Sequence, residues 1–585
     1  MVKILKQAGV SGEINLTVPP KPEMGDLAFA CFDIAKQLNV KPQEIASKIV
    51  LAIRNNTNIT VELSRPSSLP DSIEHEAHII NVSGTIISSF RAFGPYVNFF
   101  LNSRAVADEI LGEMKSKGKN YGANNSGAKK KVMVEFAHPN THKAVHIGHL
   151  RNMITGESMV RLLENSNFKV VRANYQGDVG MQVAKCLWGV EHLAPEYEQA
   201  KKAGVSERAK FLGQAYAFGA QAFEKDEQAK QEIGEYNKKI YSQDKAIKKI
   251  YALTRKWSLE YFDAIYRRVG VNKFDHLYFE SEMPKRAVEI VRAGLKSGIF
   301  KESQGAVIFE GSKYGLHDRV FLNSQGLPVY EAKDQALAQM QFKEYNPTEI
   351  LHLVAKEQTE YFKVIFKALE FTLPESIGRE KHLMYGWVSL KEGKMSSRTG
   401  QVVLAEWLLD EVEKKIAEVM KERQIKNQAA TIKKIAIAAV KYSMLKTGVG
   451  NNIIFDINES ISLTGSSGPY LLYIGARIQS ILRKAGAVSK KLIIPAEIAV
   501  QEKNLLLKLG EFEEVTAVAA TEYDPSKIAH YLFDLAKKFN EFYDNCPVIQ
   551  ATGDQKIFRL NIIQSVYQVM ERGLYLLGIE TVEEM

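Results

Sequence analysis

The residues best suited to chemistry lie in one short stretch, His146-Ile147-Gly148-His149, at the start of an expected helix. The two histidines are three residues apart, so both lie on one side of the first helical turn and can donate to phosphate oxygens. The free N–H groups and the helix dipole at such a start favour an anion. Gly148 leaves room for a flat base or ribose beside the backbone. The pattern indicates nucleoside triphosphate binding; an accidental helix cap with two solvated histidines is the alternative.

Two strands and a helix are predicted to position this turn. The apolar run Lys131 to Phe136 is typical of a parallel strand that is covered on both faces. Apolar residues then recur at helical spacing from Ile147 to Leu163, and a second apolar run follows at Val170 to Ala173. Strand, loop, helix and strand make one βαβ unit, which favours the functional interpretation of the histidines over accidental capping.

The stretch His146 to His149 resembles the HIGH signature of class I aminoacyl-tRNA synthetases. Its surroundings, namely Val134-Glu135-Phe136, Pro139-Asn140, Lys143 and the continuation to Arg151, resemble the corresponding series in arginyl-tRNA synthetases. The resemblance extends over nearly the whole chain. It implies an arginine–tRNA ligase, which activates arginine with ATP to arginyl-adenylate and transfers arginine to the 3′ end of tRNA(Arg).

Length and composition fit a multidomain protein. A chain of 585 residues exceeds one core, and 45% hydrophobic with 25% charged residues is ordinary for soluble proteins. The net charge of +9 is compatible with a polyanionic partner. Cys31, Cys186 and Cys546 are far apart, which gives neither a zinc motif nor a disulfide framework. Because no signal-like start or membrane-length apolar run is present, a cytoplasmic protein is expected.

Three domains are expected, and the fold class is α/β multidomain. Residues 1–125 are predicted to form an α+β domain that resembles the family's N-terminal additional domain, which contacts the tRNA elbow; a simple interaction domain is the alternative. Residues 126–404 are predicted to form the class I catalytic domain, a Rossmann-like parallel sheet with a helical insertion at about 190–305. Residues 405–585 are predicted to be an α-helical bundle, similar to the family's anticodon-binding domain.

A second group of chemical residues lies at 393–400, GKMSSRTG. Glycines, small hydroxyls and cations suit a loop that closes on a leaving pyrophosphate. The segment resembles the KMSKS loop, except that Ser397 stands where the second lysine is usual. Which cation replaces that lysine stays open. By resemblance, the catalytic residues are His146, His149, Lys143, Lys394 and Arg398. The residues implied for ATP binding are His146, Gly148, His149, Lys394, Met395 and Ser396.

The resemblance also implies an arginine site. A guanidinium calls for carboxylates in planar, bidentate geometry. The residues implied are Glu135 and Asp334 for the guanidinium, Tyr330 beside it, and Asn140 and Gln358 for the α-amino and carboxylate groups. Without the resemblance, Tyr330 and Asp334 would be a surface tyrosine and a helical charge. His138 replaces a small hydroxyl residue of the family motif, so its role is open. Asp178 is expected to cap the next helix or to bind ribose hydroxyls.

The C-terminal bundle carries the predicted tRNA contacts. Tyr470, Tyr473 and Arg477 share one face of a predicted helix, where they can stack on and clamp unpaired anticodon bases. Tyrosines that pack in the core are the alternative. The expected partners are tRNA(Arg), arginine and ATP, with Mg²⁺ bound to the nucleotide. No protein-bound zinc or other metal site and no membrane are expected, and the chain is expected to be a monomer.

Two other classes of protein compete with this hypothesis. A nucleotidyltransferase with a HIGH turn that acts on a small molecule would need neither the N-terminal domain nor the helical bundle. A non-catalytic tRNA-binding relative would be expected to lack the HIGH histidines or the loop lysine, yet both are present.

Overall fold

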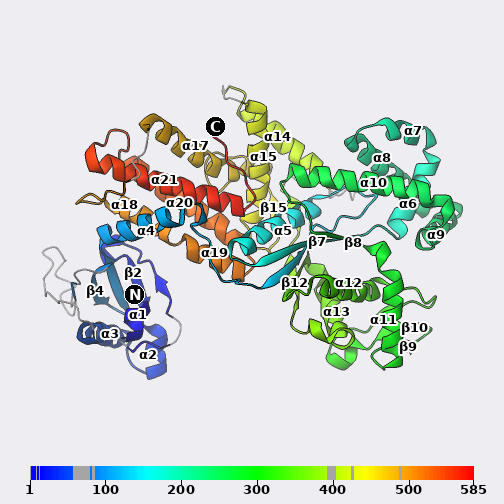
Figure 1. Ribbon diagram of the computed structural model, residues 1–585, viewed down its shortest axis with the longest axis horizontal. Coiled ribbons are helices and arrows are strands. Elements are labelled where there is room, and N and C mark those ends of the chain that lie inside the picture. Colours follow the sequence, from blue (N-terminus) through cyan, green and yellow to red (C-terminus); the bar gives the residue numbers. More distant parts are fainter. Residues whose placement is uncertain are drawn as a thin grey trace. The chain divides into compact units, whose positions relative to one another are not determined.

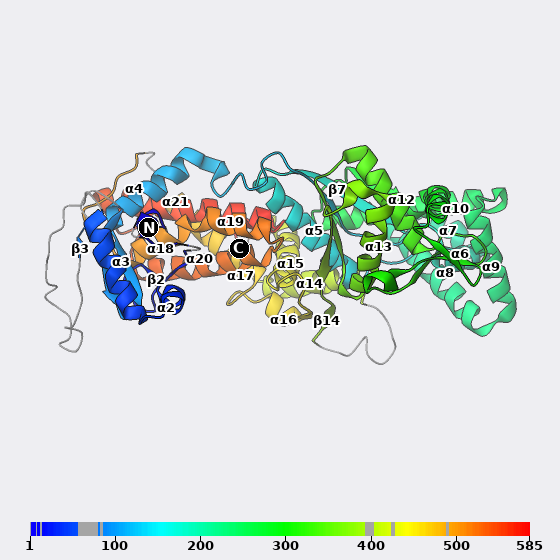
Figure 2. The same ribbon diagram turned by 90° about the horizontal axis from the view of Figure 1, so that it is seen from below.

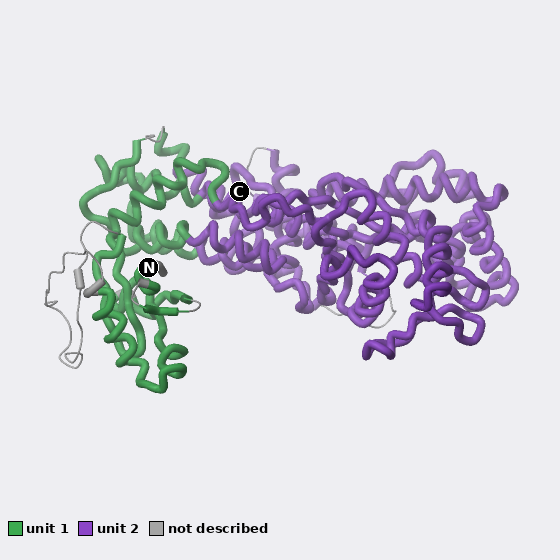
Figure 3. Tube along the Cα trace, turned by 60° about the horizontal axis from the view of Figure 1, so that its bottom comes forward, with its two compact units in different colours: residues 1–121, 482–510, 537–566 green, residues 122–481, 511–536, 567–585 purple. Residues whose placement is uncertain are grey.

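The computed structural model describes residues 2–7, 9–11, 14–56, 80–81, 86–391, 403–422, 427–486 and 491–585. These residues fall into two compact units (Figure 3). One unit comprises residues 1–121, 482–510 and 537–566, and the other comprises 122–481, 511–536 and 567–585. The predicted loop at 393–400, with Lys394, Met395, Ser396 and Arg398, lies outside the described residues.

The first unit contains an antiparallel sheet in the order β1-β2-β5-β4-β3. Its strands are β1 (Leu16–Thr17), β2 (Leu27–Ala30), β3 (Ile80–Asn81), β4 (Ile87–Phe93) and β5 (Tyr96–Leu101). Its helices include α1 (Val2–Gln7), α2 (Phe32–Leu38), α3 (Pro42–Asn56), α4 (Ser103–Lys117) and α18 (Val500–Gly510). Helix α3 packs on β4 and β5 (Figure 1). The predicted α+β arrangement is confirmed, and the Lys503–Asp26 ion pair at 2.6 Å joins α18 to the loop before β2.

The second unit is built on a five-stranded parallel sheet in the order β13-β12-β6-β7-β8. The strands are β6 (Lys131–Glu135), β7 (Lys169–Gln176), β8 (His276–Phe279), β12 (Glu349–Ala355) and β13 (Glu380–Tyr385). Helix α5 (Ile147–Asn165) connects β6 to β7. The predicted βαβ unit and parallel sheet are therefore confirmed.

Helices cover both faces of this sheet (Figures 1 and 2). On one face α5 approaches closely, since a Cβ on Gly156 would lie 2.3 Å from the ring of Phe136. On the other face α12 (Tyr330–Tyr345) and α13 (Thr359–Thr372) share a buried apolar cluster with Met133 of β6. Because strand side chains alternate, Glu135 points to the same face as Met133, toward α12 and α13.

Between β7 and β8 the chain forms a helical subdomain. Its helices are α6 (Met181–His192), α7 (Ala194–Lys202), α8 (Val205–Lys225), α9 (Glu227–Tyr241) and α10 (Lys245–Arg268). The helical run ends at Arg268 rather than near 305, because residues 276–279 return to the main sheet as β8. This strand has only four residues and lies between two helices, so it gives almost no period-two signal.

The segment after β8 adds α11 (Pro284–Lys296) and a separate antiparallel sheet of β9 (Lys301–Ser303), β10 (Ala306–Phe309) and β11 (Arg319–Leu322). These three strands lie outside the parallel sheet. They pack with α11 and α12, which places the start of α12 beside the site.

The remaining chain is mostly helical, as predicted. The helices are α14 (Ala405–Val419), α15 (Gln428–Leu445), α16 (Ile457–Ser460), α17 (Gly468–Ala485), α19 (Phe512–Thr521), α20 (Ser526–Asn545) and α21 (Gly553–Leu576). One short strand, β15 (Ile453–Phe455), pairs in parallel with β14 (Val388–Leu390). Within the described ranges, no helix is long and apolar enough to cross a membrane.

Candidate active site

The two histidines at the start of α5 form a reciprocal helix cap. His146 Nδ1 accepts from the backbone N–H groups of Gly148 at 3.1 Å and His149 at 3.3 Å. His149 Nδ1 accepts in turn from the backbone N–H of His146 at 3.3 Å, and the two rings stack with centroids 3.7 Å apart. The capping interpretation is thus correct for the local structure. It does not exclude the functional one, because each ring retains its Nε2.

The cap also fixes the protonation of both rings. Since both Nδ1 atoms accept backbone N–H groups, the proton of each neutral ring is on Nε2. Burial lowers the pKa of His149 to about 3, and the neighbouring His146 adds to that effect. Burial and Lys143 also lower the pKa of His146. Two neutral N–H donors are thus available at neutral pH, at a helix start that favours anions.

The loop between β6 and α5 is held in a strained conformation. Ala137, His138 and His142 all have positive φ angles, of 78°, 47° and 63°. The amide oxygen of Asn152 accepts from the backbone N of Ala137 at 2.5 Å, and that of Asn174 accepts from the backbone N of His138 at 3.2 Å. These buried amides stabilise conformations that cost about 1–3 kcal/mol each.

The strained loop brings Asn140 against Gly177 at the end of β7, where the two residues form a parallel bridge. A Cβ on Gly177 would lie 2.2 Å from Asn140 Oδ1, so any other residue there would displace the Asn140 side chain. His138 Nδ1 contacts the carbonyl of Tyr175 at 3.3 Å, while its buried Nε2 has no partner among the described residues. His138 therefore has a nitrogen available to a ligand.

Arg151, the last residue of the HIGH-like series, is 1% exposed and contacts only peptide oxygens among its described hydrogen bonds. Its guanidinium donates to the carbonyls of Gly386, Trp387, Val449 and Asn451 at 2.5–3.2 Å. These contacts hold the residues that directly follow β13 and the segment before β15 against α5. Arg151 is therefore a structural residue.

The residues that directly follow the 392–402 segment lie close to the histidine turn. Val403 accepts from the backbone N of Ile147 at 3.0 Å, and Val145 accepts from that of Ala405 at 2.9 Å. Lys143, by contrast, lies with its Nζ 5.1 Å from the ring centre of Tyr216 on α8. The described chain thus resumes after the 392–402 segment next to the predicted phosphate site.

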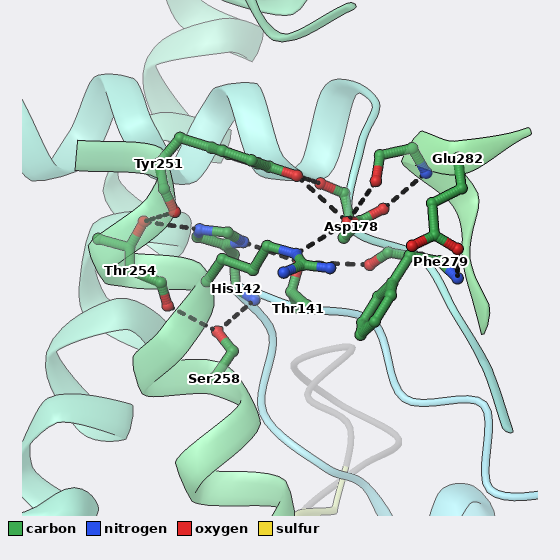
Figure 4. A network of polar contacts seen from close by, with 11 residues as sticks. Thr141, His142, Asp178, Tyr251, Thr254, Ser258, Phe279 and Glu282 are labelled. Carbon is green, nitrogen blue, oxygen red and sulfur yellow. Dashed lines mark hydrogen bonds and ion pairs between the residues drawn. The ribbon is translucent and has the colours of Figure 1, made fainter. Parts of the chain in front are cut away.

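Helix α10 supports the same loops from the helical subdomain (Figure 4). Asp178 is 0% exposed, and its carboxylate accepts from Arg255 Nε at 2.9 Å and from the hydroxyls of Tyr251 at 3.2 Å and Ser281 at 2.8 Å. Of the two roles expected for Asp178, capping of the next helix is wrong, because the cap residue of α6 is Gly180. Binding of ribose hydroxyls stays a prediction. Asp178 instead joins α10 to the ends of β7 and β8.

His142 provides the second anchor of α10 (Figure 4). Its ring nitrogens contact the hydroxyls of Thr141 and Thr254, both at 2.9 Å, and its backbone N donates to Ser258 Oγ at 3.0 Å. Burial lowers its pKa to about 3, so the ring is neutral. This histidine organises the loop before the HIGH-like turn.

A cavity of about 520 Å³ opens between the sheet and helices α12 and α13. All five residues predicted to bind arginine line it: Glu135, Asn140, Tyr330, Asp334 and Gln358. They come from four separate segments of the chain. The cavity also has an apolar wall from α13, formed by Phe362, Ile365, Phe366 and Leu369.

Five carboxylates line this cavity: Glu135, Glu280, Glu331, Asp334 and Glu380. Two have a cation of their own, since Lys333 contacts Glu280 at 2.5 Å and Arg319 contacts Glu331 at 3.0 Å. A single histidine, His352, is shared by Glu135 and Glu380. Among the described residues, three cations thus face five carboxylates, which leaves two negative charges in excess when all are ionised. Such a cavity suits a ligand with two positive charges.

Asp334 is the least balanced of these carboxylates. Its Oδ2 accepts from the hydroxyl of Tyr361 at 2.7 Å. Burial raises the pKa of Asp334 to about 7, although the Tyr361 hydrogen bond opposes the rise. A cation that enters the cavity would relieve this penalty, because it stabilises the ionised form.

The sequence did not indicate His352, Glu380, Tyr361, Glu280 or Lys333 as site residues. Each lies in a strand, helix or turn whose pattern is one of packing. The exception is the polar His352 within the apolar run of β12, a signal that could have identified it.

The predicted tRNA residues lie on α17. Tyr470 is 9% exposed and its ring packs edge-on against Phe533 at 5.9 Å, which favours the core-tyrosine alternative at this position. Tyr473 and Arg477 are partly exposed on the same helix. For these two, anticodon contact stays a prediction.

Comparison with known proteins places this architecture in a class. The family model described as "tRNA synthetases class I (R), catalytic domain" matches residues 111–457. The DALR anticodon binding domain matches residues 471–585, and the arginyl tRNA synthetase N terminal domain matches residues 2–66. The site is thus that of a class I aminoacyl-tRNA synthetase.

Relatives narrow the class to one family. The chain is 33% identical to an arginine–tRNA ligase of Treponema denticola over 98% of this chain and 95% of the relative. It is 30% identical to that of Clostridium perfringens over 97% and 96%. The arginyl-tRNA synthetase of Thermus thermophilus superposes with a TM-score of 0.80 at 25% identity, covering 100% and 98%. This chain belongs to the arginyl-tRNA synthetase family, whose function is to charge tRNA with arginine.

Proposed function

We propose that this chain binds arginine in the cavity between the sheet and helices α12 and α13, and activates it with ATP at the start of α5. The observation that supports this most is the excess of two negative charges in the cavity. Free arginine carries two cationic groups, the guanidinium and the α-ammonium. The α-carboxylate, the reacting group, then lies toward the carboxyl ends of the strands, where ligands bind in such folds.

The residues of the cavity receive separate roles. Glu135 and Asp334 accept from the guanidinium, and the apolar wall of α13 packs on the aliphatic stem. Tyr330, 59% exposed at the start of α12, flanks the entrance. Asn140 and Gln358 hold the α-amino and carboxylate groups.

In the first step, an α-carboxylate oxygen of arginine attacks the α-phosphorus of ATP. A new O–P bond forms, the bond to the bridging oxygen breaks, and pyrophosphate leaves with its electron pair. No side-chain nucleophile is required, so the protein acts by positioning and by charge stabilisation. His146 and His149 donate their Nε2 protons to phosphate oxygens as charge develops there. Lys143, Lys394 and Arg398 supply positive charge.

Mg²⁺ is proposed to enter with the nucleotide. Across the described part of the chain, no three His, Cys, Asp or Glu side chains are grouped to hold a metal. Magnesium bound mainly by phosphates and water fits this donor set. The ion would share the charge of the triphosphate with the histidines and lysines.

In the second step, the terminal ribose hydroxyl of tRNA(Arg) attacks the carbonyl of the adenylate, and AMP leaves. The N-terminal domain (1–125) is proposed to contact the tRNA elbow, and the helical bundle (405–585), with Tyr473 and Arg477, the anticodon. We further propose a monomeric enzyme of the cytoplasm.

We propose that tRNA takes part in the first step as well. The helical bundle begins at Ala405, directly after the 393–400 loop, so anticodon docking can bias the closure of that loop. Arginine-dependent exchange of pyrophosphate into ATP should be negligible without tRNA and should appear with cognate tRNA. High salt should weaken the effect by screening phosphate contacts.

The test is an aminoacylation assay with each of the twenty amino acids, run beside the exchange assay with and without tRNA. Charging of arginine alone supports the proposal. Robust exchange without tRNA would contradict the coupling and favour a small-molecule nucleotidyltransferase. Absence of exchange and charging under all conditions would favour a non-catalytic tRNA-binding relative.

A further inference from the structure

The strand side of the arginine cavity contains a charged triad that neither the motifs nor the family comparison assigns. His352 on β12 lies between two glutamates on the neighbouring strands. Its Nδ1 is 3.1 Å from Glu135 Oε1 on β6, and its Nε2 is 2.6 Å from Glu380 Oε2 on β13. All three side chains line the cavity.

The sheet register explains why these residues meet. His352 pairs with Glu135 across the β12–β6 ladder, so the two side chains point to the same face. Glu380 pairs with Ile350, two residues before His352, and therefore lies on that face too, farther from the carboxyl ends. The rings of Phe362 and Phe366 lie with centroids 5.4 and 5.7 Å from that of His352, which fixes its orientation.

The contacts require His352 to be an imidazolium. A carboxylate oxygen faces each ring nitrogen, and ionised carboxylates only accept, so both nitrogens must donate. Burial opposes the charge, but Glu135 and Glu380 together raise the pKa of His352 well above its ordinary value. His352 in turn holds the pKa of Glu135 below its usual range, against the effect of burial. The triad as a whole therefore carries one net negative charge.

The two glutamates differ in what they can still accept. Both oxygens of Glu135 are engaged, Oε1 by His352 and Oε2 by the amide of Gln341. Glu380 uses only Oε2, and its Oε1 is buried without a partner among the described residues. A carboxylate oxygen in that state costs free energy unless a donor reaches it.

The position of Glu380 suits the far end of a long substrate. Glu380 starts β13, whereas Glu135 ends β6, and a two-residue offset in register is about 6–7 Å along the strands. The α-amino and carboxylate groups are assigned above to Asn140 and Gln358 near the opposite, carboxyl ends of the strands. A guanidinium on an extended stem then points inward, toward the open oxygen of Glu380.

We propose that Glu380 is a specificity-determining residue that accepts an N–H of the substrate guanidinium, and that His352 is a positioning residue that holds Glu380 and Glu135 in the receiving geometry. This inference rests on the proposed arginine site and extends it by a third carboxylate. A neutral analogue of the same shape, such as citrulline, gains little from that carboxylate, because it has no charge to match.

The decisive variant is Glu380→Gln, which keeps the shape and removes the charge. Aminoacylation kinetics should show the KM for arginine raised about 10- to 100-fold, with kcat and the KM for ATP changed less than about threefold. Inhibition by citrulline should be unchanged, so the preference for arginine over citrulline falls by the same factor. Glu360→Gln is the matched control, because Glu360 lies on α13 but is more than half exposed and pairs with Lys363.

His352→Gln tests the positioning role. It should raise the KM for arginine, and combined with Glu380→Gln it should give less than the product of the two single effects, since His352 acts through Glu380. Effects that multiply fully would overturn the positioning role. A loss of citrulline binding in step with arginine binding would indicate a collapsed cavity and would also overturn it.

Glu380→Asp keeps the charge and guards against a variant that fails to fold. Retention of most arginine affinity by this variant, beside a loss in Glu380→Gln or an unstable Glu380→Gln, supports the charge role. An arginine KM within twofold of the wild type in folded Glu380→Gln would overturn the inference, while charging of arginine by the wild type would leave the proposed function intact. A wild type that does not charge arginine would overturn both.

Discussion

The two ends of the active site solve opposite electrostatic problems. The turn at His146 and His149 meets a polyanion with neutral rings and backbone N–H groups, whereas the arginine cavity meets a cation with buried carboxylates. Neutral donors can be buried at little cost, because their remaining nitrogens are satisfied by the helix cap. Burial of a carboxylate costs free energy, and three of the five negative charges are balanced by Lys333, Arg319 and His352. The phosphate site can therefore be stable without a ligand, whereas the arginine cavity is stabilised when a cationic ligand binds.

The largest expected effect tests the charged end. Asp334→Asn keeps the side-chain shape and removes one of the two excess charges, so arginine affinity should fall by roughly 2–5 kcal/mol, the range for a broken buried charge pair. Measured arginine KM values, with the exposed Asp263→Asn of α10 as control, check this. An unchanged KM for arginine would contradict the role of Asp334 in binding the guanidinium.

The next effect tests the neutral end. His149→Ala removes one Nε2 donor, and the kcat for adenylate formation should fall about 10²- to 10³-fold, as for loss of one oxyanion-type donor. Arginine affinity should change little, because the hydrogen bond strengthens only as charge develops on the phosphates. Equal activity in the alanine variant would leave His149 as a helix-cap residue alone.

A double substitution sharpens the same end. Lys143→Ala and Lys394→Ala should each lower kcat, and together they should lower it by less than the product of the single effects, since both cations serve one triphosphate. Single-turnover rates of all four combinations give the coupling. Independent, fully multiplying losses would assign the two lysines to separate tasks.

A pH dependence should separate the two ends. The pKa of Asp334 is raised to about 7 in the empty cavity, and arginine binds its ionised form. The arginine KM should therefore fall about tenfold as pH rises from 6 to 8. Asp334→Asn should abolish this dependence. Because the histidines stay neutral over this range, the KM for ATP should not follow the same curve.

The smallest effect concerns stability without ligand. Because the folded pKa of Asp334 lies above its unfolded value, its contribution to the free energy of unfolding falls as pH rises from about 4 to 7. Asp334→Asn removes the buried charge, so at pH 8 the empty variant should melt at a higher temperature than the wild type. The difference should shrink as pH falls below 7 and vanish below about pH 4, where Asp334 is protonated in both the folded and the unfolded state. A lower melting temperature of the variant at pH 8 would contradict the conclusion that the ionised Asp334 carboxylate destabilises the empty cavity.

The same contrast explains what the sequence could predict. The histidine turn is local, since its two rings, its cap and its glycine lie within four residues, and a local pattern suffices to identify it. Glu135, Tyr330 and Asp334 could be placed together only through the family resemblance, because the sheet order that unites them depends on long-range pairing. The triad of Glu135, His352 and Glu380 depends on the register of three strands spread over some 245 residues. Nothing in the local patterns fixes that register.

The role of Asp178 shows a second limit of prediction from the sequence. Asp178 had a local explanation as a helix cap, yet its carboxylate is taken by Arg255, 77 residues away on α10. A tertiary partner with a full charge outcompeted the cap. The local sequence thus indicated that Asp178 would accept hydrogen bonds, but the tertiary fold determined which donors it meets.

The carbonyls around Arg151 have a consequence for how this chain is made. The two terminal nitrogens of the guanidinium on α5 donate to peptide oxygens, the last of them that of Asn451, 300 residues later. At about 5–20 residues per second, a ribosome needs roughly 15–60 s to supply that partner. Until then Arg151 on α5 lacks some of the acceptors that its guanidinium has in the folded protein. The full set of acceptors for this guanidinium is therefore available only after the chain has been made as far as Asn451.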